Sequence, residues 1–202
     1  MNAAIAAPAR HWLLMCALGV VVLVPTSASA APSPVQADFG TLFVSVNAGD
    51  TTPHDISVSY SGTVYVVTDP AGAAPVGPGC TSLGAGAVSC PEPGINNIAV
   101  TGGEGDDRIT VASVGPGVAA NPLGSVVASF SLGGNDVITT PGTRDVLSGG
   151  DGKDVVNAGA GDDRLSGDAG KDKLTGGPGS DRCRGGKGKD KAASCEKEIG
   201  IP

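Results

Sequence analysis

The residues most able to do chemistry in this chain are aspartates that recur every nine positions. From Ser131 the sequence divides without a gap into seven nine-residue units, or nonads: SLGGNDVIT, TPGTRDVLS, GGDGKDVVN, AGAGDDRLS, GDAGKDKLT, GGPGSDRCR and GGKGKDKAA. Aspartate fills the sixth column of every nonad, at Asp136, Asp145, Asp154, Asp163, Asp172, Asp181 and Asp190. Carboxylates are hard oxygen ligands, which suit the large and flexible coordination of calcium better than that of zinc or copper. The column therefore predicts calcium binding.

The other columns of the nonads separate turn residues from a buried residue. Glycine fills the fourth column in six nonads, with Thr143 as the exception, and its backbone freedom lets carbonyl oxygens turn toward an ion. The eighth column is mostly aliphatic: Ile138, Leu147, Val156, Leu165, Leu174, Cys183 and Ala192. Burying one such side chain contributes roughly 1.5–3 kcal/mol, whereas ordering the backbone of one nonad costs about 9–18 kcal/mol. The apolar column therefore cannot drive folding by itself.

Stacking of the nonads would also bring their aspartates close together. At a strand spacing of about 4.8 Å, two carboxylates repel by about 0.9 kcal/mol in water, and more strongly where water is excluded. A divalent cation between them reverses the sign of that interaction. Magnesium requires a tighter octahedron and keeps its waters, so calcium is the ion that we expect.

An isolated earlier copy of the pattern, GGEGDDRIT, occupies residues 102–110 and carries Asp107 and Ile109 in the same two columns. Its first residue lies 29 positions before Ser131, which is not a multiple of nine. We therefore expect this copy on a coil that precedes an insertion.

A disordered Gly/Asp-rich tail is the alternative interpretation of the array. Residues 149–198 hold ten basic and ten acidic side chains, so a solvated, charge-balanced segment is conceivable. Apolar residues kept in one column of period nine argue against it, because a disordered tail has no reason to keep them there.

The nonads resemble the RTX or haemolysin-type calcium repeat, G-G-x-G-x-D-x-U-x, in which U is a large apolar residue. Three nonads, which begin at Gly149, Gly176 and Gly185, match its glycine and aspartate positions in full. The resemblance implies an all-β fold in which the nonads form a parallel β-roll, two nonads to a coil, here preceded by a small β region. It further implies that calcium lies between turns on the same side of the roll, bound by aspartate carboxylates and by carbonyl oxygens of the glycine-rich loops.

The resemblance carries over to particular residues of this chain. The expected carboxylate pairs lie two nonads apart: Asp145 with Asp163, Asp154 with Asp172, Asp163 with Asp181, and Asp172 with Asp190. Asp136 with Asp154 is a weaker pair, since Ser131 and Leu132 replace two glycines, and Asp107 is a further candidate. The expected loop glycines are Gly150, Gly152, Gly159, Gly161, Gly170, Gly177, Gly179, Gly186 and Gly188. The turn acids outside the sixth column are expected to be solvated: Asp106, Asp151, Asp162 and Asp168.

Residues 1–30 have the features of a secretory signal peptide. Arg10 precedes a 13-residue apolar run at 12–24, and small residues at 26–30 predict cleavage after Ala30. As a helix this run spans only about 20 Å of a hydrocarbon core that is about 30 Å thick, so a membrane anchor is less favoured. We therefore expect a secreted protein with no membrane span in its mature chain. The whole chain is similar to small exported calcium-binding repeat proteins of bacteria, and this resemblance implies a bacterial source.

The segments between the signal and the array differ in composition. Residues 31–40 are rich in Ala, Pro and Ser and are predicted to be a linker. Residues 41–101 are predicted to form a small β domain, because Leu42, Val44 and Val46 alternate with other residues and a hairpin pattern joins 56–60 to 64–68. Residues 71–94 lack a periodic apolar pattern and are predicted to be a surface loop. Residues 102–130 hold the isolated copy and the insertion, and residues 131–195 are predicted to form the roll.

Four cysteines remain after removal of the signal: Cys80, Cys90, Cys183 and Cys195. An even number in an exported chain indicates disulfides. Close spacing favours pairing Cys80 with Cys90 and Cys183 with Cys195, although three pairings are possible. Metal binding is the alternative, but no C-x-x-C spacing occurs. A bond between Cys183 and Cys195 would fix the far end of the roll, where repeat architectures need a cap.

The sequence contains no catalytic motif, and no residue is predicted to be catalytic. The formal net charge is −7, or −8 without Arg10, which disfavours nucleic acid as a partner. We therefore expect an exported, non-enzymatic calcium-binding protein. One alternative is a surface adhesin or envelope-matrix component that binds cell-envelope material or another protein. A less favoured alternative is an extracellular hydrolase that uses His54, the one histidine left after signal removal.

Overall fold

The computed structural model describes residues 12–17, 20–25, 33–38, 40–46, 49–75, 79–119, 127–130 and 132–201. The expected cleavage position, Ala30, and the first residue of the array, Ser131, lie outside them. Strands β1 (Trp12–Ala17) and β2 (Val20–Pro25) pair with each other antiparallel, inside the segment expected to be the signal. None of the helices in the described part of the chain is long and apolar enough to cross a membrane.

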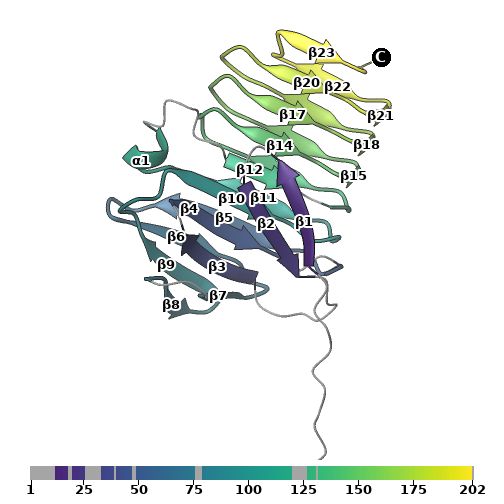
Figure 1. Cartoon of the computed structure of the whole chain (residues 1–202). Coiled ribbons are helices and arrows are strands. Elements are labelled where there is room, and N and C mark those ends of the chain that lie inside the picture. Colours follow the sequence, from purple (N-terminus) through teal and green to yellow (C-terminus); the bar gives the residue numbers. More distant parts are fainter. Residues whose placement is uncertain are drawn as a thin grey trace, which may run out of the picture.

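Two nine-stranded sheets make up most of the fold (Figure 1). The first has the order β23-β20-β17-β14-β12-β10-β4-β3-β7. Its strands in chain order are β3 (Ser33–Asp38), β4 (Thr41–Ser45), β7 (Ala73–Pro75), β10 (Asn97–Thr101), β12 (Val127–Phe130), β14 (Val146–Ser148), β17 (Arg164–Ser166), β20 (Arg182–Arg184) and β23 (Lys197–Ile199).

The second sheet has the order β22-β19-β16-β13-β11-β5-β6-β9-β8. Its strands are β5 (Asp55–Tyr60), β6 (Val64–Thr68), β8 (Thr81–Gly84), β9 (Ala87–Pro91), β11 (Arg108–Val111), β13 (Val137–Thr139), β16 (Val155–Asn157), β19 (Lys173–Thr175) and β22 (Lys191–Ala193). A third sheet of three short strands joins turns of the roll: β15 (Asp151–Gly152), β18 (Ala169–Gly170) and β21 (Lys187–Gly188). The one described helix is α1 (Pro116–Ala119).

Successive nonads alternate between the two long sheets, so each strand pairs in parallel with the strand two nonads away. Val137 pairs with Val155 in one sheet, and Val146 pairs with Arg164 in the other, each with a separation of 18 residues. One coil of the roll is therefore two nonads long. The all-β fold with a parallel roll of repeats is confirmed.

The eighth column forms the core of the roll. Ile138, Leu147, Val156, Leu165, Leu174 and Cys183 are buried in one cluster, and Ala192 packs against it at the far end. The alternation between strands explains this cluster, because each three-residue strand turns only its middle side chain between the sheets. The column spacing in the sequence thus determines the core.

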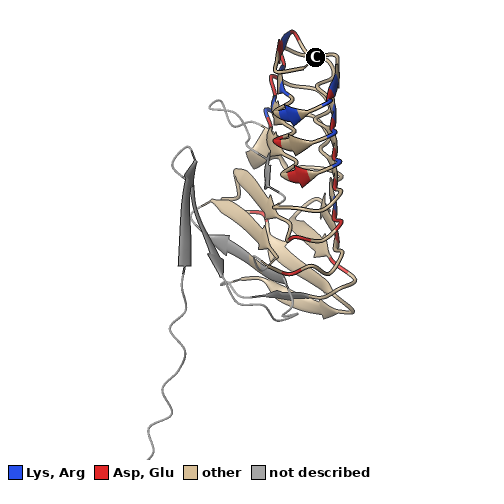
Figure 2. Ribbon diagram, turned by 90° about the vertical axis from the view of Figure 1, so that its right-hand side faces the viewer, with Lys and Arg blue, Asp and Glu red and all other residues tan. Residues whose placement is uncertain are grey.

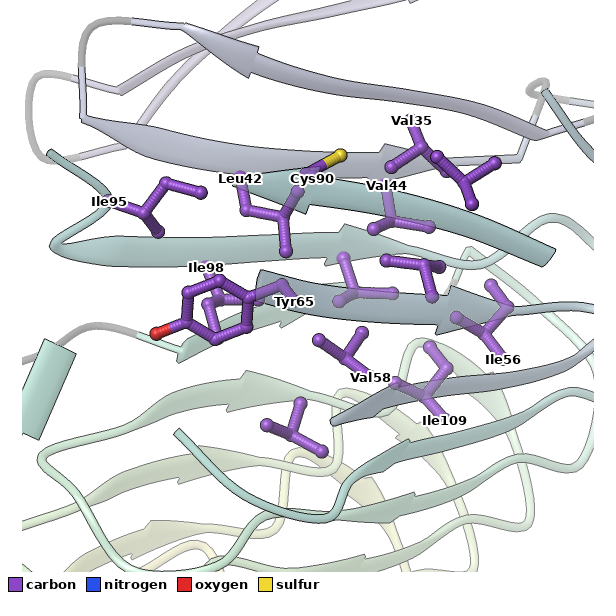
Figure 3. Packing of buried hydrophobic residues seen from close by; sticks show 14 of the residues in the cluster. Val35, Leu42, Val44, Ile56, Val58, Tyr65, Cys90, Ile95, Ile98 and Ile109 are labelled. Atoms are coloured by element: carbon purple, nitrogen blue, oxygen red, sulfur yellow. The ribbon is translucent and has the colours of Figure 1, made fainter. Parts of the chain in front are cut away.

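A larger core lies between the same two sheets nearer the N-terminus. Figure 3 shows Leu42, Val44 and Ile98 from the first sheet meeting side chains of the second, which include Ile56, Val58, Tyr65 and Ile109. The buried Tyr65 hydroxyl oxygen accepts a hydrogen bond from the Gly115 amide, which satisfies its polar group. The predicted alternation in β4 and the antiparallel hairpin of β5 and β6 are both confirmed.

The sheets continue without interruption from this larger core into the roll. Strand β11, which follows Asp107, lies between β5 and β13 in the second sheet, and β12 lies between β10 and β14 in the first. Arg108 pairs with Val137 at a separation of 29 residues, which is 11 more than the 18 of a regular coil. The extra length holds α1 and part of the segment leading to β12. The isolated copy therefore stacks directly beneath the array.

Two segments differ from their sequence-based expectations. Residues 33–38, expected within a linker, form β3, which pairs antiparallel with β4 and buries Val35. The expected surface loop at 71–94 contains the hairpin of β8 and β9, and β9 also pairs with β6. Val88 and Cys90 alternate with exposed or half-buried neighbours in β9, a two-apolar pattern too short to stand out in the sequence. A turn with positive φ at Ala85 and Gly86 closes this hairpin.

Two disulfides join Cys80 to Cys90 and Cys183 to Cys195, the pairing that close spacing favoured. The second bond links the core position on β20 to the segment that leads into β23. It therefore holds the last strand of the roll, which has a neighbour on one side only.

We predict that replacing Cys183 by Val and Cys195 by Ser destabilises the calcium-loaded chain by about 3 kcal/mol, because the unfolded chain gains the entropy of a released loop. Valine keeps an apolar side chain in the eighth column, as Val156 does in its own nonad, so the loss of the tether is isolated from loss of packing. Chemical unfolding measures the change. Free thiols at positions 183 and 195 in the native chain, detected by intact mass, would refute the bond.

Candidate metal centre

Aspartates of the sixth column form a ladder of hydrogen bonds on each side of the roll. On one side the amide of each aspartate donates to Oδ1 of the aspartate two nonads later: Asp136 to Asp154 (2.9 Å), Asp154 to Asp172 (3.0 Å) and Asp172 to Asp190 (3.1 Å). On the other side Asp145 donates to Asp163 (2.8 Å) and Asp163 donates to Asp181 (2.9 Å). The structure thus brings together every pair that the resemblance implied, Asp136 with Asp154 included.

In five of these aspartates the second carboxylate oxygen accepts no hydrogen bond. Within the described part of the chain, Oδ2 of Asp154, Asp163, Asp172, Asp181 and Asp190 is buried and has no hydrogen-bond partner. A buried anionic oxygen without a donor is unfavourable by several kcal/mol. A cation beside these oxygens would offset that cost.

Main-chain oxygens converge on the same points. A Cβ added to Gly167 would meet both Oδ2 of Asp172 and the carbonyl oxygen of Gly185, and one added to Gly185 would meet Oδ2 of Asp190 and the carbonyl oxygen of Gly200. No group of three His, Cys, Asp or Glu side chains forms a metal cluster among the described residues. A cation at these points would therefore be held by a mixture of carboxylate and carbonyl oxygens, the donor set that suits calcium.

Burial shifts the protonation of the ladder. It raises the pKa of Asp154 to about 6 and that of Asp163 to about 7, although each carboxylate accepts a main-chain hydrogen bond that acts in the opposite direction. Neighbouring aspartates of the same ladder raise both values further. The pKa values of Asp172 and Asp181 are raised for the same first reason. Charging this column without a cation is therefore costly.

Comparison with known families identifies the repeat in which this ladder lies. Residues 130–165 and 158–192 match the family described as the RTX calcium-binding nonapeptide repeat, with four copies. These residues are RTX repeats. RTX nonapeptide repeats bind Ca²⁺, and the chain is a calcium-binding repeat protein. Comparisons with curated proteins and with solved structures found no match.

The fourth-column glycines of the RTX array let successive turns stack closely. Their φ angles lie between 144° and 153° at Gly152, Gly161, Gly170, Gly179 and Gly188. A Cβ at Gly170 would overlap the carbonyl oxygen of Gly152, and one at Gly188 would overlap that of Gly170. Both the backbone angle and the contact therefore require glycine.

Five of the second-column positions also have positive φ. The predicted loop glycines Gly150, Gly159, Gly177 and Gly186 have φ between 83° and 115°. Asp168 stands in this column in the fifth RTX nonad with φ of 66°, a conformation that aspartate tolerates better than most residues. Its exposed carboxylate accepts hydrogen bonds from Ser148 and Ser166. The other turn acids, Asp106, Asp151 and Asp162, are also exposed, as expected.

Asp107, at the base of the RTX ladder, differs from the aspartates above it. Its amide donates to Oδ1 of Asp136, which continues the ladder (2.7 Å). Its own Oδ1 accepts from the His54 amide and its Oδ2 accepts from the Gly103 amide, both at 2.9 Å. Because both oxygens already have donors, Asp107 offers less to a metal ion than the array aspartates do. Its assignment as a ligand stays a prediction.

His54 occupies the ladder position below Asp107. Its carbonyl oxygen accepts from the Arg108 amide, as that of Asp107 accepts from Val137. The ring is buried, with Nδ1 2.7 Å from Oδ2 of Asp69 and Nε2 3.6 Å from Oδ2 of Asp50. The hydrogen bond to Asp69 raises the pKa of His54. The His54 imidazole thus lies among carboxylates at the base of the ladder, a position that the sequence pattern did not reveal.

Glu196 is the second residue that sequence reasoning missed. The Asp181 amide donates to its Oε2 (2.6 Å), so a glutamate follows Asp181 in the ladder where the regular nonads have ended. Glu196 directly precedes β23, as Asp181 directly precedes β20. This shared position before a strand is the one feature that could have pointed to Glu196.

The raised pKa values predict that, in chelator, the stability of the folded chain increases as the pH falls. The folded pKa of Asp163, about 7, lies above the unfolded value of about 4, so the stabilisation from its protonation is complete below pH ~4 and is lost as the pH rises through 7. Without calcium, the far-UV β signal and the melting temperature should therefore increase from pH 8 to pH 5, the latter by at least about 2 °C.

Millimolar calcium should reverse this trend, because the ion binds the carboxylate form. The raised pKa of His54 acts in the same direction as that of Asp163, so the chelator series is repeated with Asp163→Asn, which should weaken the dependence. A chelator series in which stability rises from pH 5 to pH 8 would contradict the prediction.

Proposed function

We propose that this chain is an exported, non-enzymatic protein whose roll takes up calcium between aspartates two nonads apart. In this proposal the ions lie between Asp145 and Asp163, Asp154 and Asp172, Asp163 and Asp181, and Asp172 and Asp190, with Asp136 a weaker contributor. Carbonyl oxygens of the second- and fourth-column loops complete the donor set. Bound calcium supplies the positive charge that the column lacks.

The buried Oδ2 atoms are the single observation that carries this proposal. Five of them lack a hydrogen-bond partner in the described part of the chain, and they recur every nine residues, once in each nonad from the third to the seventh. A structural role alone would have placed a donor beside each one, because native proteins rarely leave buried polar atoms unpaired. The distribution of charge agrees: Figure 2 shows acidic and basic residues concentrated on the narrow C-terminal stack, over a broad region with few charges.

Isothermal titration calorimetry of the chain that starts at Ala31 tests the proposal. Calcium should bind at several sites and magnesium much more weakly, because the rigid octahedron of magnesium does not match loop carbonyls. Equal affinity for the two ions, or no calcium binding at millimolar concentration, would refute the proposed sites.

The absence of an enzymatic role and the export of the chain are also parts of the proposal. The burial of His54 supports the first, since its ring is held between Asp50 and Asp69 and the residue is 4% exposed. The secretory features of residues 1–30 support the second. Expression in an export-competent bacterium should yield a chain that begins at Ala31. A retained N-terminus would contradict export by cleavage.

A surface-adhesin or envelope-matrix role is the second candidate. The observation in its favour is the continuity of both sheets from the larger core into the roll, which would let a calcium-loaded roll act as a stiff extension of the N-terminal part. Calcium-dependent retention on purified cell-envelope material would support this role. Recovery of all the protein in the unbound fraction would reject it.

A further inference from the structure

The ladder that contains Asp145, Asp163 and Asp181 continues past the end of the nonads. A sixth-column acid two nonads after Asp181 would fall at residue 199, which is Ile199. The last coil is instead shortened, since Arg182 pairs with Lys197 at a separation of 15 residues where Arg164 pairs with Arg182 at 18. This shortening brings Glu196 to the ladder position.

Main-chain geometry confirms that Glu196 occupies a regular rung. The Arg182 amide donates to the carbonyl oxygen of Asp163 (2.9 Å), and the Lys197 amide donates in the same way to that of Asp181 (3.0 Å). The Asp181 amide donates to Glu196 as the Asp163 amide donates to Asp181. Glu196 therefore stands to Asp181 as Asp181 stands to Asp163.

Asp181, the rung before Glu196, has a carboxylate oxygen that lacks a donor. Asp181 is 2% exposed, and its Oδ2 has no hydrogen-bond partner among the described residues. A Cβ added to Gly176 would meet both this oxygen and the carbonyl oxygen of Ser194. Ser194 has φ of 52°, an unusual angle for serine, and it immediately precedes Cys195. The disulfide to Cys183 thus fixes the three residues 194–196 against Asp181.

A cavity of about 500 Å³ opens at this place, and its lining includes Asp163, Asp181 and Glu196. Basic side chains line it as well: Arg144, Arg164, Arg182 and Lys197. Their charge opposes a cation, so a site here should bind more weakly than the pairs inside the roll.

We propose that Asp181, Glu196 and the carbonyl oxygen of Ser194 form an additional calcium site that closes the C-terminal end of this ladder. The inference rests on the proposed function of the array, since it places one more ion of the same kind. It assigns the ion to a glutamate outside the nonad pattern. The Cys183–Cys195 bond holds that glutamate beside Asp181.

Calorimetry with calcium on the chain from Ala31 tests the site through Glu196→Gln, with Glu198→Gln as the matched control. Glu198 is an exposed acid two residues further along, on β23. The glutamine at 196 keeps an oxygen for the Asp181 amide but loses the charge, so this variant should bind one ion fewer. The control should bind as many ions as the unaltered chain.

The outcomes separate the two levels of the proposal. If the unaltered chain binds no calcium, the proposed function fails. If it binds calcium and Glu196→Gln binds the same number of ions with the same affinities, the terminal site alone is overturned. Crystals of the unaltered chain soaked in terbium give a measurement that does not depend on folding of the variant. Anomalous density between Asp181 and Glu196 supports the site, whereas density at the inner pairs alone overturns it.

Discussion

Replacement of Asp172 by Asn is expected to remove about 5 kcal/mol of calcium-dependent stability. Asp172 belongs to two of the proposed sites, with Asp154 and with Asp190, and each site contributes about 2.7 kcal/mol when calcium is present at a hundred times its dissociation constant. Asparagine has nearly the same shape and keeps an Oδ1 that can accept from the Asp154 amide. The loss therefore reports on the missing charge. Chemical unfolding with and without calcium measures it, and calorimetry should find up to two ions fewer.

Asp151→Asn is the matched control for this substitution. Asp151 is an exposed acid in a turn of the same ladder side, and its removal changes the net charge by the same amount. We expect its effect to stay within about 0.5 kcal/mol, as for other surface substitutions. Similar losses for both variants would show that general charge, rather than a defined site at Asp172, governs the calcium response.

The second large effect is expected at Gly170, where Ala should cost at least about 4 kcal/mol in the calcium-loaded chain. The φ of 153° lies in a region that is almost exclusive to glycine, with a penalty of about 1–3 kcal/mol. The added Cβ would also overlap the carbonyl oxygen of Gly152, a main-chain atom in the paired strand β15. The stack of turns would have to open to accept it. Chemical unfolding in millimolar calcium measures the loss.

Gly62→Ala is a control that separates the cost of the backbone angle from the cost of the steric overlap at Gly170. Gly62 has φ of 74°, but a Cβ there would meet no heavy atom within 4 Å. Only the backbone penalty of about 1–2 kcal/mol applies. A cost at Gly170 no larger than that at Gly62 would mean that the turns are not packed as closely as the ladder requires.

The roll could be predicted from the sequence because one period sets every contact in it. The spacing of nine places Asp154 and Asp172 on the same side and Val156 and Leu174 in the same core, so pairing, register and core follow from a single number. The glycines could be placed as well, since a turn that repeats needs the same backbone angles each time. In a fold without repeats, strand pairing and register depend on contacts between distant segments. Here the repeat spacing alone determines them.

The N-terminal part could be predicted only where its pattern was local. The hairpin of β5 and β6 shows alternation and a turn signal, and both were visible in the sequence. Strand β3 was hidden by the prolines and serines around Val35, because its stability comes from pairing with β4 rather than from its own composition. Nothing in the sequence shows which distant strand offers a free edge.

The two ends of the ladders were unpredictable for a related reason. His54 and Glu196 take ladder positions without belonging to a nonad, so period nine excludes both. Each is placed by tertiary structure: His54 by the pairing of β5 with β11, and Glu196 by a shortened coil and a disulfide. The repeat pattern therefore predicts the positions inside the array, but not the residues that occupy the ladder positions at its two ends.

Hydrogen exchange of the chain from Ala31, in chelator and in millimolar calcium, tests the dependence of the roll on calcium most directly. In calcium, the amides of strands β13 to β22 should gain protection by at least about a hundredfold, since closing of the ladder by the ion suppresses local opening. Amides of β5 and β6 should change little, because their core contains no proposed site. Equal protection of the roll in chelator and in calcium would contradict the account.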